Sequence, residues 1–499
     1  MLFMLIASVL AAVAVAAVAV AAAHGPGWLR RQQTRRRSAW GLAPTAHVVG
    51  FFHPHCYGGG GGERVLWTAI HAIQTARPEQ TIALYCQADP RTADLTRLLD
   101  LVKTQFRIAV RPERLVLVRL QSCRFAEAKT WPRLTLILQS LGAIIPAIEA
   151  LWKLPCHVFV ETVGYAFVYP VARLWACTVV TYTHYPTIST NMLDKVASRR
   201  PDFNNSSLIA RYPLLSHIKY AYYRLFAALY GAAGRAAHVV MLNSRWTAAH
   251  VCALWHLPPA AAPSPSAAAA SRRQAFLVYP PCDTEALQQS SLDERTRTIV
   301  YVAQFRPEKA HPLVLEAFAA ALADPGLSAA DADAAATWRL ELIGGARHPA
   351  DQARAAALAA RARHHGLADR VVLRPNAPYP VLAQALATAA IGVHAMADEH
   401  FGICIVEYMA AGCLVLAHGS GGPATDILDP GVSGVLATTL AEYTAGLVHL
   451  MTMPPARQLA MRTAARTKAA TFSNARFHDG WMAVLSPLLP PEPRGRKNP

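Results

Sequence analysis

Short apolar runs alternate with longer segments of helical periodicity from residue 47 onward. The runs "HVVGFF", "TIALYC", "RLVLVRL", "VFVETV" and "CTVVTYT" are typical of buried strands, and "GERVLWTAIHAI" and "RTADLTRLLDLVKTQ" between them are typical of helices. Apolar strands that alternate with helices predict parallel sheets that are covered by helices.

A second series of the same kind follows an interruption. The Pro/Ala/Ser stretch "LPPAAAPSPSAAAASRR" at residues 257–273 predicts a surface insertion. The second series then begins with "TIVYVAQF" and "HPLVLEAFAAAL" and ends near "LVLAHG"; within it, "SAADADAAAT" predicts a second loop insertion. The fold class is therefore α/β, with two tandem Rossmann-like doubly wound domains. Ligands of such sheets bind outside the carboxyl ends of the strands, so chemistry is expected in a cleft between two facing sheets.

The amino terminus predicts a membrane anchor. Residues 1–23 contain no charge, and a helix of that length can cross a hydrocarbon core of about 30 Å. Five arginines follow between residues 30 and 37, and no acid precedes Glu63, so the positive-inside rule keeps the remainder cytosolic. A cleaved signal peptide is the alternative, although its basic residues normally precede the apolar core.

These patterns give an expected division of the chain into five parts. They are a transmembrane anchor (1–23), a basic juxtamembrane linker (24–46), an N-terminal Rossmann-like domain (47–283), a C-terminal Rossmann-like domain (284–470), and a C-terminal helix with a disordered tail (471–499).

Composition narrows the classes of partner. The formal net charge of +17 over 499 residues indicates an anionic partner, which is a nucleic acid, a phosphate-bearing small molecule or an anionic membrane. The basic-aromatic sheets and zinc knuckles of RNA-binding proteins are absent from the sequence, so no nucleic acid is expected. The nine cysteines are odd in number and show no C-x-x-C spacing, which favours buried free thiols in a reducing compartment.

The glycine run in "FFHPHCYGGGGGERVLW" (51–67) lies between a predicted strand and a predicted helix, where backbone N–H groups receive anions. It does not match G-x-G-x-x-G, and no Gly-Lys-Ser/Thr closes it as in a P-loop. We therefore expect Gly60, Gly61 and Gly62 to lie against a ligand; a flexible turn is the alternative.

Three histidines need separate interpretation. His53 and His55 have the spacing of a metal pair, but no further ligand stands nearby, so no metal is predicted. His184 follows the strand "CTVVTYT" and is expected to face the cleft, although a lone histidine is often structural.

The second series has its own candidate anion site. Arg306 and Lys309 lie in "AQFRPEKAHP", between a predicted strand and a predicted helix. Two cations beside a helix amino terminus suit a diphosphate, and a solvated charge pair is the alternative.

Two carboxylates follow in "DEHFGICIVEYMAAG". On one helix Glu399 and Glu407 would be about 12 Å apart, so Gly402 favours Glu399 in a loop and Glu407 inside the next helix. Each can accept hydrogen bonds from a different hydroxyl-rich part of one ligand. Gly421 and Gly422 in "GSGG" again present bare backbone. Carboxylates, cations and glycines together indicate a nucleotide-sugar site.

Two further apolar stretches leave membrane contact open. Residues 134–152 are interrupted by polar residues, and residues 217–234 mix two cations with tyrosines and leucines. Residues 134–152 favour a buried or interfacial helix, with a second membrane span as the alternative. Residues 217–234 suit the membrane interface, and a core helix is the alternative.

At this point the chain resembles glycosyltransferase family 4, whose members are retaining enzymes of the GT-B architecture. The resemblance rests on the E-x7-E motif of Glu399 and Glu407, on Arg306 and Lys309, and on the long stretches "HYPTISTNML", "NSRWT", "VYPPCD", "LIGGAR" and "EHFGICIVEYMAAGCLVLAHGSGGP". Within that family the set is similar to the α1,2-mannosyltransferases that extend the dolichol-linked oligosaccharide of asparagine-linked glycosylation.

The resemblance implies a function and roles for residues. It implies transfer of mannose from GDP-mannose, in two successive additions, to a dolichol-diphosphate oligosaccharide on the cytosolic face of the endoplasmic reticulum, without a metal or other cofactor. Arg306 and Lys309 would stabilise the leaving diphosphate, Glu399 would hold the mannose hydroxyls and Glu407 the ribose, and His184 would contact the sugar near its reacting carbon.

The glycine run would then meet the sugar and phosphate, with the N-terminal domain on the acceptor side and the C-terminal domain binding the donor. Other mannosyltransferases of the pathway are expected partners. A family 4 enzyme with another donor or lipid acceptor, and a non-catalytic membrane-tethered nucleotide-sugar-binding protein, are the alternatives.

Overall fold

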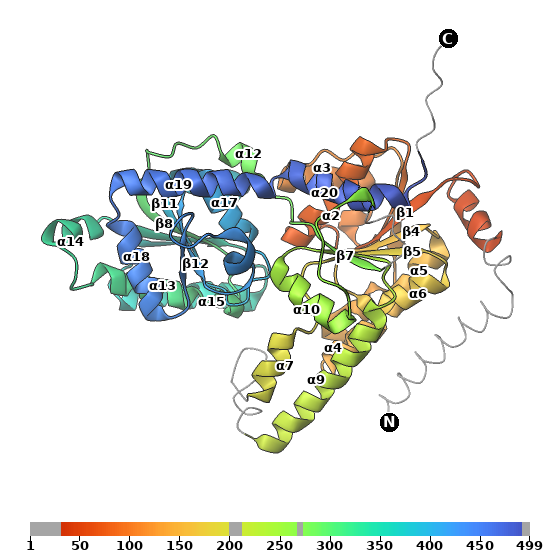
Figure 1. The fold of residues 1–499 in the computed structure, drawn as a ribbon, viewed down its shortest axis with the longest axis horizontal. Helices are drawn as coiled ribbons and strands as arrows, with labels where there is room; N and C mark the ends of the chain where they lie inside the picture. The colour runs from red at the N-terminus through yellow and green to blue at the C-terminus, as the bar shows by residue number, and fades with distance from the viewer. Residues whose placement is uncertain (1–30, 199–211, 267–272, 492–499) are drawn as a thin grey trace, which may run out of the picture. The chain divides into compact units, whose positions relative to one another are not determined.

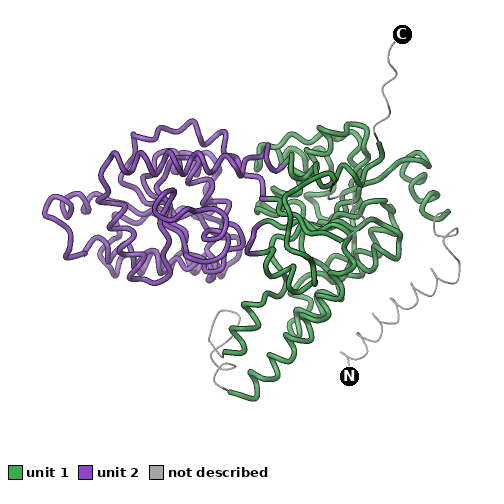
Figure 2. The backbone as a smooth tube through the Cα atoms, in the orientation of Figure 1, with its two compact units in different colours: residues 1–243, 247–278, 478–499 green, residues 244–246, 279–477 purple. Residues whose placement is uncertain are grey.

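The computed structural model describes residues 31–198, 212–266 and 273–491 (Figure 1). The anchor expected at residues 1–23 lies outside these ranges, as do residues 492–499 of the expected tail. Within the described ranges, contacts divide the chain into two compact units (Figure 2). The N-terminal unit contains residues up to 243, 247–278 and those from 478 onward, and the C-terminal unit contains residues 244–246 and 279–477.

The N-terminal unit is built on a seven-stranded parallel sheet of order β3-β2-β1-β4-β5-β6-β7. Its strands are β1 (Val48–Phe52), β2 (Thr81–Gln87), β3 (Leu115–Leu120), β4 (Val158–Glu161), β5 (Thr178–Thr183), β6 (Val239–Leu242) and β7 (Gln274–Leu277). The accompanying helices are α2 (Gly61–Ala76), α3 (Leu95–Phe106), α4 (Thr135–Gly142), α5 (Ile144–Lys153), α6 (Tyr169–Leu174), α7 (Thr190–Ala197), α9 (Pro213–Gly234), and most of α10 (Arg245–Trp255) and α20 (Asn474–Leu485). The first residues of α10 and α20, 245–246 and 474–477, are counted with the C-terminal unit.

The C-terminal unit repeats this plan with a six-stranded parallel sheet of order β10-β9-β8-β11-β12-β13. Its strands are β8 (Thr296–Val302), β9 (Arg339–Gly344), β10 (Val371–Pro375), β11 (Ala389–His394), β12 (Leu414–His418) and β13 (Val435–Ala437). Its helices are α12 (Thr284–Leu287), α13 (His311–Leu322), α14 (Ala329–Ala335), α15 (Pro349–His364), α16 (Tyr379–Thr388), α17 (Ile403–Ala411), α18 (Leu440–Met451) and α19 (Pro455–Ala469). The predicted pair of parallel α/β sheets is confirmed.

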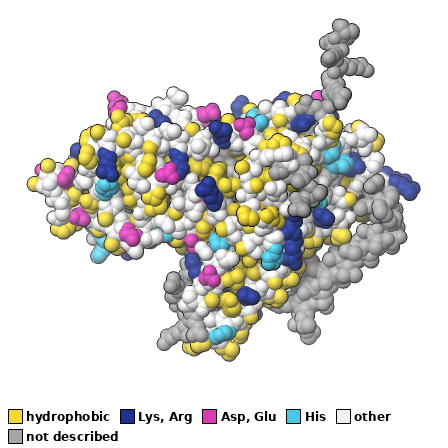
Figure 3. All heavy atoms as spheres, viewed as in Figure 1, with side chains coloured by type: hydrophobic (Ala, Val, Ile, Leu, Met, Phe, Trp, Pro, Cys, Tyr) yellow, Lys and Arg dark blue, Asp and Glu magenta, His cyan; other side chains and the backbone are white. Residues whose placement is uncertain are grey.

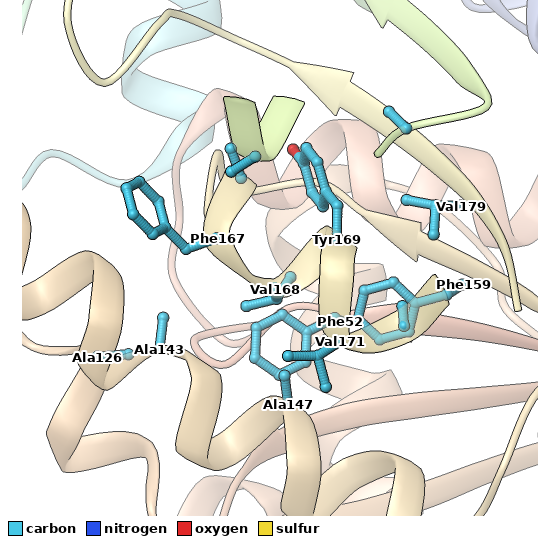
Figure 4. Packing of buried hydrophobic residues seen from close by; sticks show 14 of the residues in the cluster. Phe52, Ala126, Ala143, Ala147, Phe159, Phe167, Val168, Tyr169, Val171 and Val179 are labelled. Carbon is cyan, nitrogen blue, oxygen red and sulfur yellow. The ribbon is translucent and has the colours of Figure 1, made fainter. Parts of the chain in front are cut away.

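Buried strands hold each sheet to its helices. All five residues of β1 are buried, as expected for a central strand covered on both faces. On one face of this sheet, Phe52 and Phe159 pack against Ala147 and Val171 from the helices (Figure 4). This packing fixes the strands, and with them the loops that leave their carboxyl ends.

Both sheets reverse their strand order at one point, between β1 and β4 in the first and between β8 and β11 in the second. Loops diverge at such a switch point, and the crevice between them is where open α/β sheets bind ligands. The glycine run follows β1, the Arg306–Lys309 loop follows β8, and Glu399 follows β11. The topology therefore places these predicted site residues at switch points.

The expectation of a loop at "SAADADAAAT" is wrong, because part of it forms α14. Ser328 caps this helix by accepting a hydrogen bond from the backbone N–H of Asp331, and alanine, the strongest helix former, fills most of the rest. The expected insertion at 257–273 is described at residues 257–266 and at 273, and within it Ala261 forms a parallel bridge with Phe276 of β7.

One helical segment within the described ranges is long and apolar enough to span a membrane. It covers Thr135–Lys153, corresponding to α4 and α5, with a mean hydropathy of 1.5, and 44% of its apolar window is buried inside the protein. Ala143 and Ala147 from this segment lie in the core of the N-terminal unit (Figure 4). A core helix passes the same length and hydropathy test, so the segment carries no argument for a second span.

Candidate functional site

The glycine run closes around a carboxylate of its own chain. Gly60 precedes α2 in an extended conformation, and its N–H donates a 2.8 Å hydrogen bond to Glu63 Oε2. A Cβ atom on Gly58 would lie 2.6 Å from Glu63 Oε1, and one on Gly60 would lie 2.8 Å from Oε2. Two of the five glycines are therefore required by Glu63, a cause that the sequence did not reveal.

The next two glycines begin α2 beside a predicted histidine. Gly61 and Gly62 are the first residues of that helix, and a Cβ atom on Gly62 would lie 3.6 Å from His184 Nε2. His184 follows β5, and its ring packs edge-on against Tyr182, with centroids 5.0 Å apart. The structure thus brings His184 to the helix end where the N–H groups of the first turn are exposed to a ligand.

In the C-terminal unit, a lysine, a carboxylate and a histidine meet at the switch point. Lys309 Nζ donates a 2.5 Å hydrogen bond to Glu399 Oε2, and His394 Nε2 lies 3.1 Å from the same oxygen. Lys309 ends a 3₁₀ turn (Pro307–Lys309), His394 ends β11, and Glu399 lies in the loop that follows. Met396 Sδ is 3.0 Å from Lys309 Nζ.

These three groups set one another's charge. Burial opposes ionisation of Glu399, yet the Lys309 charge and the His394 contact outweigh it and hold the pKa of the carboxyl well below its usual range. Burial also opposes the charged form of Lys309, but Glu399 outweighs it and raises the lysine pKa. Burial lowers the pKa of His394. At neutral pH the cluster is a charged lysine and a charged carboxylate beside a neutral imidazole.

The other predicted residues of this unit lie on the same two loops and on the helix that follows them. Arg306 is exposed at the start of the 3₁₀ turn. Gly402 precedes α17 with a φ of 109°, a conformation that favours glycine, and it separates Glu399 in the loop from half-buried Glu407 inside α17.

The glycines of "GSGG" pack against the Glu399 loop. A Cβ atom on Gly421 would lie 2.2 Å from the Glu399 carbonyl oxygen, and one on Gly422 would lie 2.6 Å from Phe401 Cα. The Gly422 N–H also donates a 2.8 Å hydrogen bond to the Glu399 carbonyl. Bare backbone at these positions lets two loops meet and so holds Glu399 in place.

His394 is a site residue that the sequence reasoning missed. The sequence places it within the apolar run "IGVHAM", and the structure shows that it ends β11 and contacts Glu399. The signal was present, because it stands at the carboxyl end of a strand as His184 does. Across residues 31–198, 212–266 and 273–491, no three His, Cys, Asp or Glu side chains form a group that could hold a metal ion.

His311, next to the Lys309 turn, gives a testable pH dependence. It is 2% exposed at the start of α13, and burial lowers its pKa from 6.5 to about 4. Below pH 6.5 the unfolded chain binds a proton that the folded one does not, so stability falls with acidification. From pH 7 to pH 5 this one group is expected to cost about 2 kcal/mol.

Urea unfolding followed by tryptophan fluorescence at both pH values tests this expectation. His311→Phe, which preserves the stacking on Phe305, is expected to lose about 2 kcal/mol less than wild type on acidification. Equal losses in the two proteins would contradict the expectation. His365→Phe, at a surface-exposed histidine of the same unit, is the matched control.

Two family models match the chain over most of its length. Residues 46–255 match the model described as "ALG11 mannosyltransferase N-terminus", and residues 283–468 match "Glycosyl transferases group 1". Similar proteins include the GDP-Man:Man(3)GlcNAc(2)-PP-Dol alpha-1,2-mannosyltransferases of Xenopus laevis and Homo sapiens. Each is 37% identical, over 89% of this chain and 88% or 87% of the relative.

Solved structures with the same fold are distant in sequence. Anabaena HepE in complex with UDP and glucose aligns with a TM-score of 0.55 and 15% identity, over 88% of this chain and 99% of that one. Sucrose-phosphate synthase from Thermosynechococcus elongatus aligns with a TM-score of 0.59 and 15% identity, over 87% and 96%. At this identity the likeness shows the fold alone, which is that of GT-B glycosyltransferases, as predicted.

Proposed function

The chain belongs to the family of GDP-Man:Man(3)GlcNAc(2)-PP-Dol alpha-1,2-mannosyltransferases, and we propose on this premise that it transfers mannose from GDP-mannose to a dolichol-diphosphate-linked oligosaccharide. The new linkage is α1,2, and two successive additions to a Man3GlcNAc2 acceptor are proposed. The structural observation that carries the chemistry is the charged Lys309–Glu399 pair at the switch point of the C-terminal sheet.

Lys309 is the proposed stabiliser of the leaving group. Negative charge develops on the diphosphate as its bond to the mannose carbon breaks, and a fixed cation in a partly buried site stabilises that charge strongly. Lys309 fits because only 21% of its side chain is exposed and its pKa is raised. Exposed Arg306, three residues earlier, is proposed as a second cation on the same diphosphate. Two cations neutralise it, so we propose that transfer needs no metal.

Glu399 and Glu407 are proposed to hold different parts of the donor. The contacts from Lys309 and His394 both reach Oε2 of Glu399, which leaves Oε1 to accept from a mannose hydroxyl. Glu407 is proposed to accept from the ribose. In the N-terminal unit, His184 and the N–H groups of Gly61 and Gly62 are proposed to contact the transferred sugar and its phosphate.

Mass spectrometry of a synthetic Man3GlcNAc2 acceptor on a dolichol-type lipid tests the proposed reaction. The purified full chain is expected to add one and then two hexoses with GDP-mannose, and none with UDP-glucose or UDP-GlcNAc. Sensitivity of the product to an α1,2-specific mannosidase checks the linkage. Activity that persists in excess chelator supports the metal-free mechanism, and loss restored by a divalent ion contradicts it.

We further propose that the chain acts at the endoplasmic reticulum membrane, with residues 1–23 as a single span and both units cytosolic. A surface of the N-terminal unit supports contact with a bilayer. Hydrophobic side chains are visible on the surface over α9 (Figure 3). On this helix, Leu214 is 72% exposed, Ile218 59% and Leu225 56%. These positions recur at helical spacing, so they form one stripe.

Charge on α9 agrees with this assignment. The helix contains no Asp or Glu, and Lys219 and Arg224 flank the stripe. An apolar face with cationic flanks is the composition of helices that lie in the headgroup region of anionic bilayers.

Substituting the stripe is expected to affect membrane-embedded acceptor selectively. The triple variant Leu214→Ser, Ile218→Ser and Leu225→Ser should lower the rate with acceptor in anionic proteoliposomes by about tenfold, the order expected for losing one buried leucine. The rate with a short-chain soluble acceptor should stay close to wild type. Equal losses with both acceptors would contradict membrane contact through α9.

A further inference from the structure

The Glu63 carboxylate belongs to a chain of buried polar groups that crosses the switch point of the N-terminal sheet. His53 Nε2 lies 3.8 Å from Glu63 Oε1, beyond hydrogen-bonding distance but close enough for attraction. His53 Nδ1 lies 2.8 Å from Thr162 Oγ1. His53 follows β1 and Thr162 follows β4, so this contact joins the two loops between which the strand order reverses.

These three side chains are largely shielded from water. Thr162 is fully buried, the His53 side chain is 5% exposed and that of Glu63 is 18% exposed. Burial opposes ionisation of Glu63, but His53 and the Gly60 N–H outweigh it and lower its pKa to about 2. The carboxylate is therefore charged at neutral pH, where it attracts its donors most strongly.

Other contacts hold the rest of the same loop. Trp67 Nε1 donates a 2.9 Å hydrogen bond to the Cys56 carbonyl, and Tyr57 Oη donates a 3.1 Å hydrogen bond to Gln87 Oε1. In the segment from Gly58 to Gly60, the Gly58 N–H donates to the His55 carbonyl and the Gly60 carbonyl accepts from the Arg64 N–H. The side chain that holds this segment is that of Glu63, through the Gly60 N–H.

We propose that Glu63 is a positioning residue, whose carboxylate is the internal ligand around which Gly58 and Gly60 fold, and that His53 and Thr162 fix its place. The carboxylate orients the Gly60 N–H inward and so leaves the following N–H groups of α2 directed outward. In the proposed mannosyl transfer, on which this role rests, those groups meet the sugar and phosphate. Gly58 and Gly60 thus leave space for the carboxylate, and Gly61 and Gly62 present their backbone to the substrate.

Amide hydrogen exchange of the full chain in detergent tests the positioning without any substrate. Glu63→Ala is expected to speed exchange roughly ten- to a hundredfold in a peptide covering residues 57–64, the range for losing a hydrogen bond to a charged group. A peptide from β2 should be unchanged. Glu79→Gln, at a carboxylate of 79% exposure on the same unit, is the control and should change neither. Unchanged exchange near Gly60 in Glu63→Ala would overturn the proposal.

A double-mutant cycle separates the two explanations for the glycines. If Gly58 is bare because of Glu63, Gly58→Ala should disturb exchange and activity in wild type, because its methyl group meets the carboxylate. It should disturb them much less in a Glu63→Ala background. If Gly58→Ala changed amide exchange and activity equally in both backgrounds, a ligand, and not Glu63, would be what requires the glycine.

Kinetics with rescue variants distinguish positioning from a general loss of stability. Glu63→Ala is expected to lower kcat for GDP-mannose roughly tenfold or more. Amide exchange of the β2 peptide should stay at the wild-type rate, which shows that the sheet remains folded. Glu63→Gln should recover part of this loss, because its amide oxygen still accepts from Gly60. His53→Gln, which keeps a donor near the position of Nε2, should have a higher kcat than His53→Ala. Absence of rescue in both pairs would overturn the role, whereas an inactive wild type with the expected exchange would reject only the proposed reaction.

Discussion

Turnover is expected to fall by about 10²–10³-fold when Lys309 is replaced by alanine, with a smaller change in KM for GDP-mannose. The reason is that Lys309 is proposed to act on charge that appears only as the diphosphate leaves, so its removal raises the transition state more than the bound donor. Steady-state kinetics with GDP-mannose varied and acceptor saturating measures the two constants separately.

Two controls make the Lys309 result interpretable. Lys468→Ala removes another ion-paired lysine of the C-terminal unit, whose partner is Asp429, and should leave turnover near wild type. Circular dichroism of Lys309→Ala checks the fold, because the variant leaves Glu399 buried without its strongest partner. A variant that kept its turnover number and only bound the donor more weakly would contradict the leaving-group role.

Replacing Glu399 with glutamine is expected to lower turnover by about 10²-fold or more and to shift the pH profile. The amide keeps the shape of the side chain but loses the negative charge that pairs with Lys309 and strengthens the hydrogen bond from the mannose hydroxyl. Without Glu399, burial dominates and the pKa of Lys309 falls, so the lysine loses its proton at a lower pH than in wild type. The alkaline limb of the kcat profile should therefore move to lower pH.

Glu407→Gln is the matched comparison for Glu399→Gln. Its proposed ribose contact is the same before and during reaction, so it should mainly raise KM for GDP-mannose and leave the alkaline limb in place. An unshifted alkaline limb in Glu399→Gln would show that this carboxylate does not control the charge of Lys309.

The architecture was predictable because its signals are local. Strand and helix periodicities follow from neighbours in sequence, and the helix predicted from "HPLVLEAFAAAL" is α13 itself. The error at α14 has the same local origin: an alanine-rich stretch was interpreted from its composition, although Ser328 before it is a helix cap.

The site was predictable in its residues and less so in its connections. Glu399 and Lys309 were recognisable by type and motif, but their 2.5 Å contact joins loops 90 residues apart. The His53–Thr162 contact spans 109 residues, so local spacing in the sequence assigned no partner to His53. Glycine positions were ambiguous for a related reason: a missing side chain does not tell whether a ligand, Glu63 or a neighbouring loop takes its space.

The last helix has a consequence for how the protein is made. From His478 onward α20 belongs to the N-terminal unit, where fully buried Trp481 stacks on Phe51 of β1 and packs against Tyr182 of β5. A ribosome that has translated the whole first sheet has therefore not yet supplied part of its core. The N-terminal unit can complete its packing only after the C-terminal unit has been synthesised, so a premature stop codon at position 478 would leave the earlier unit, not the later one, with an exposed apolar face.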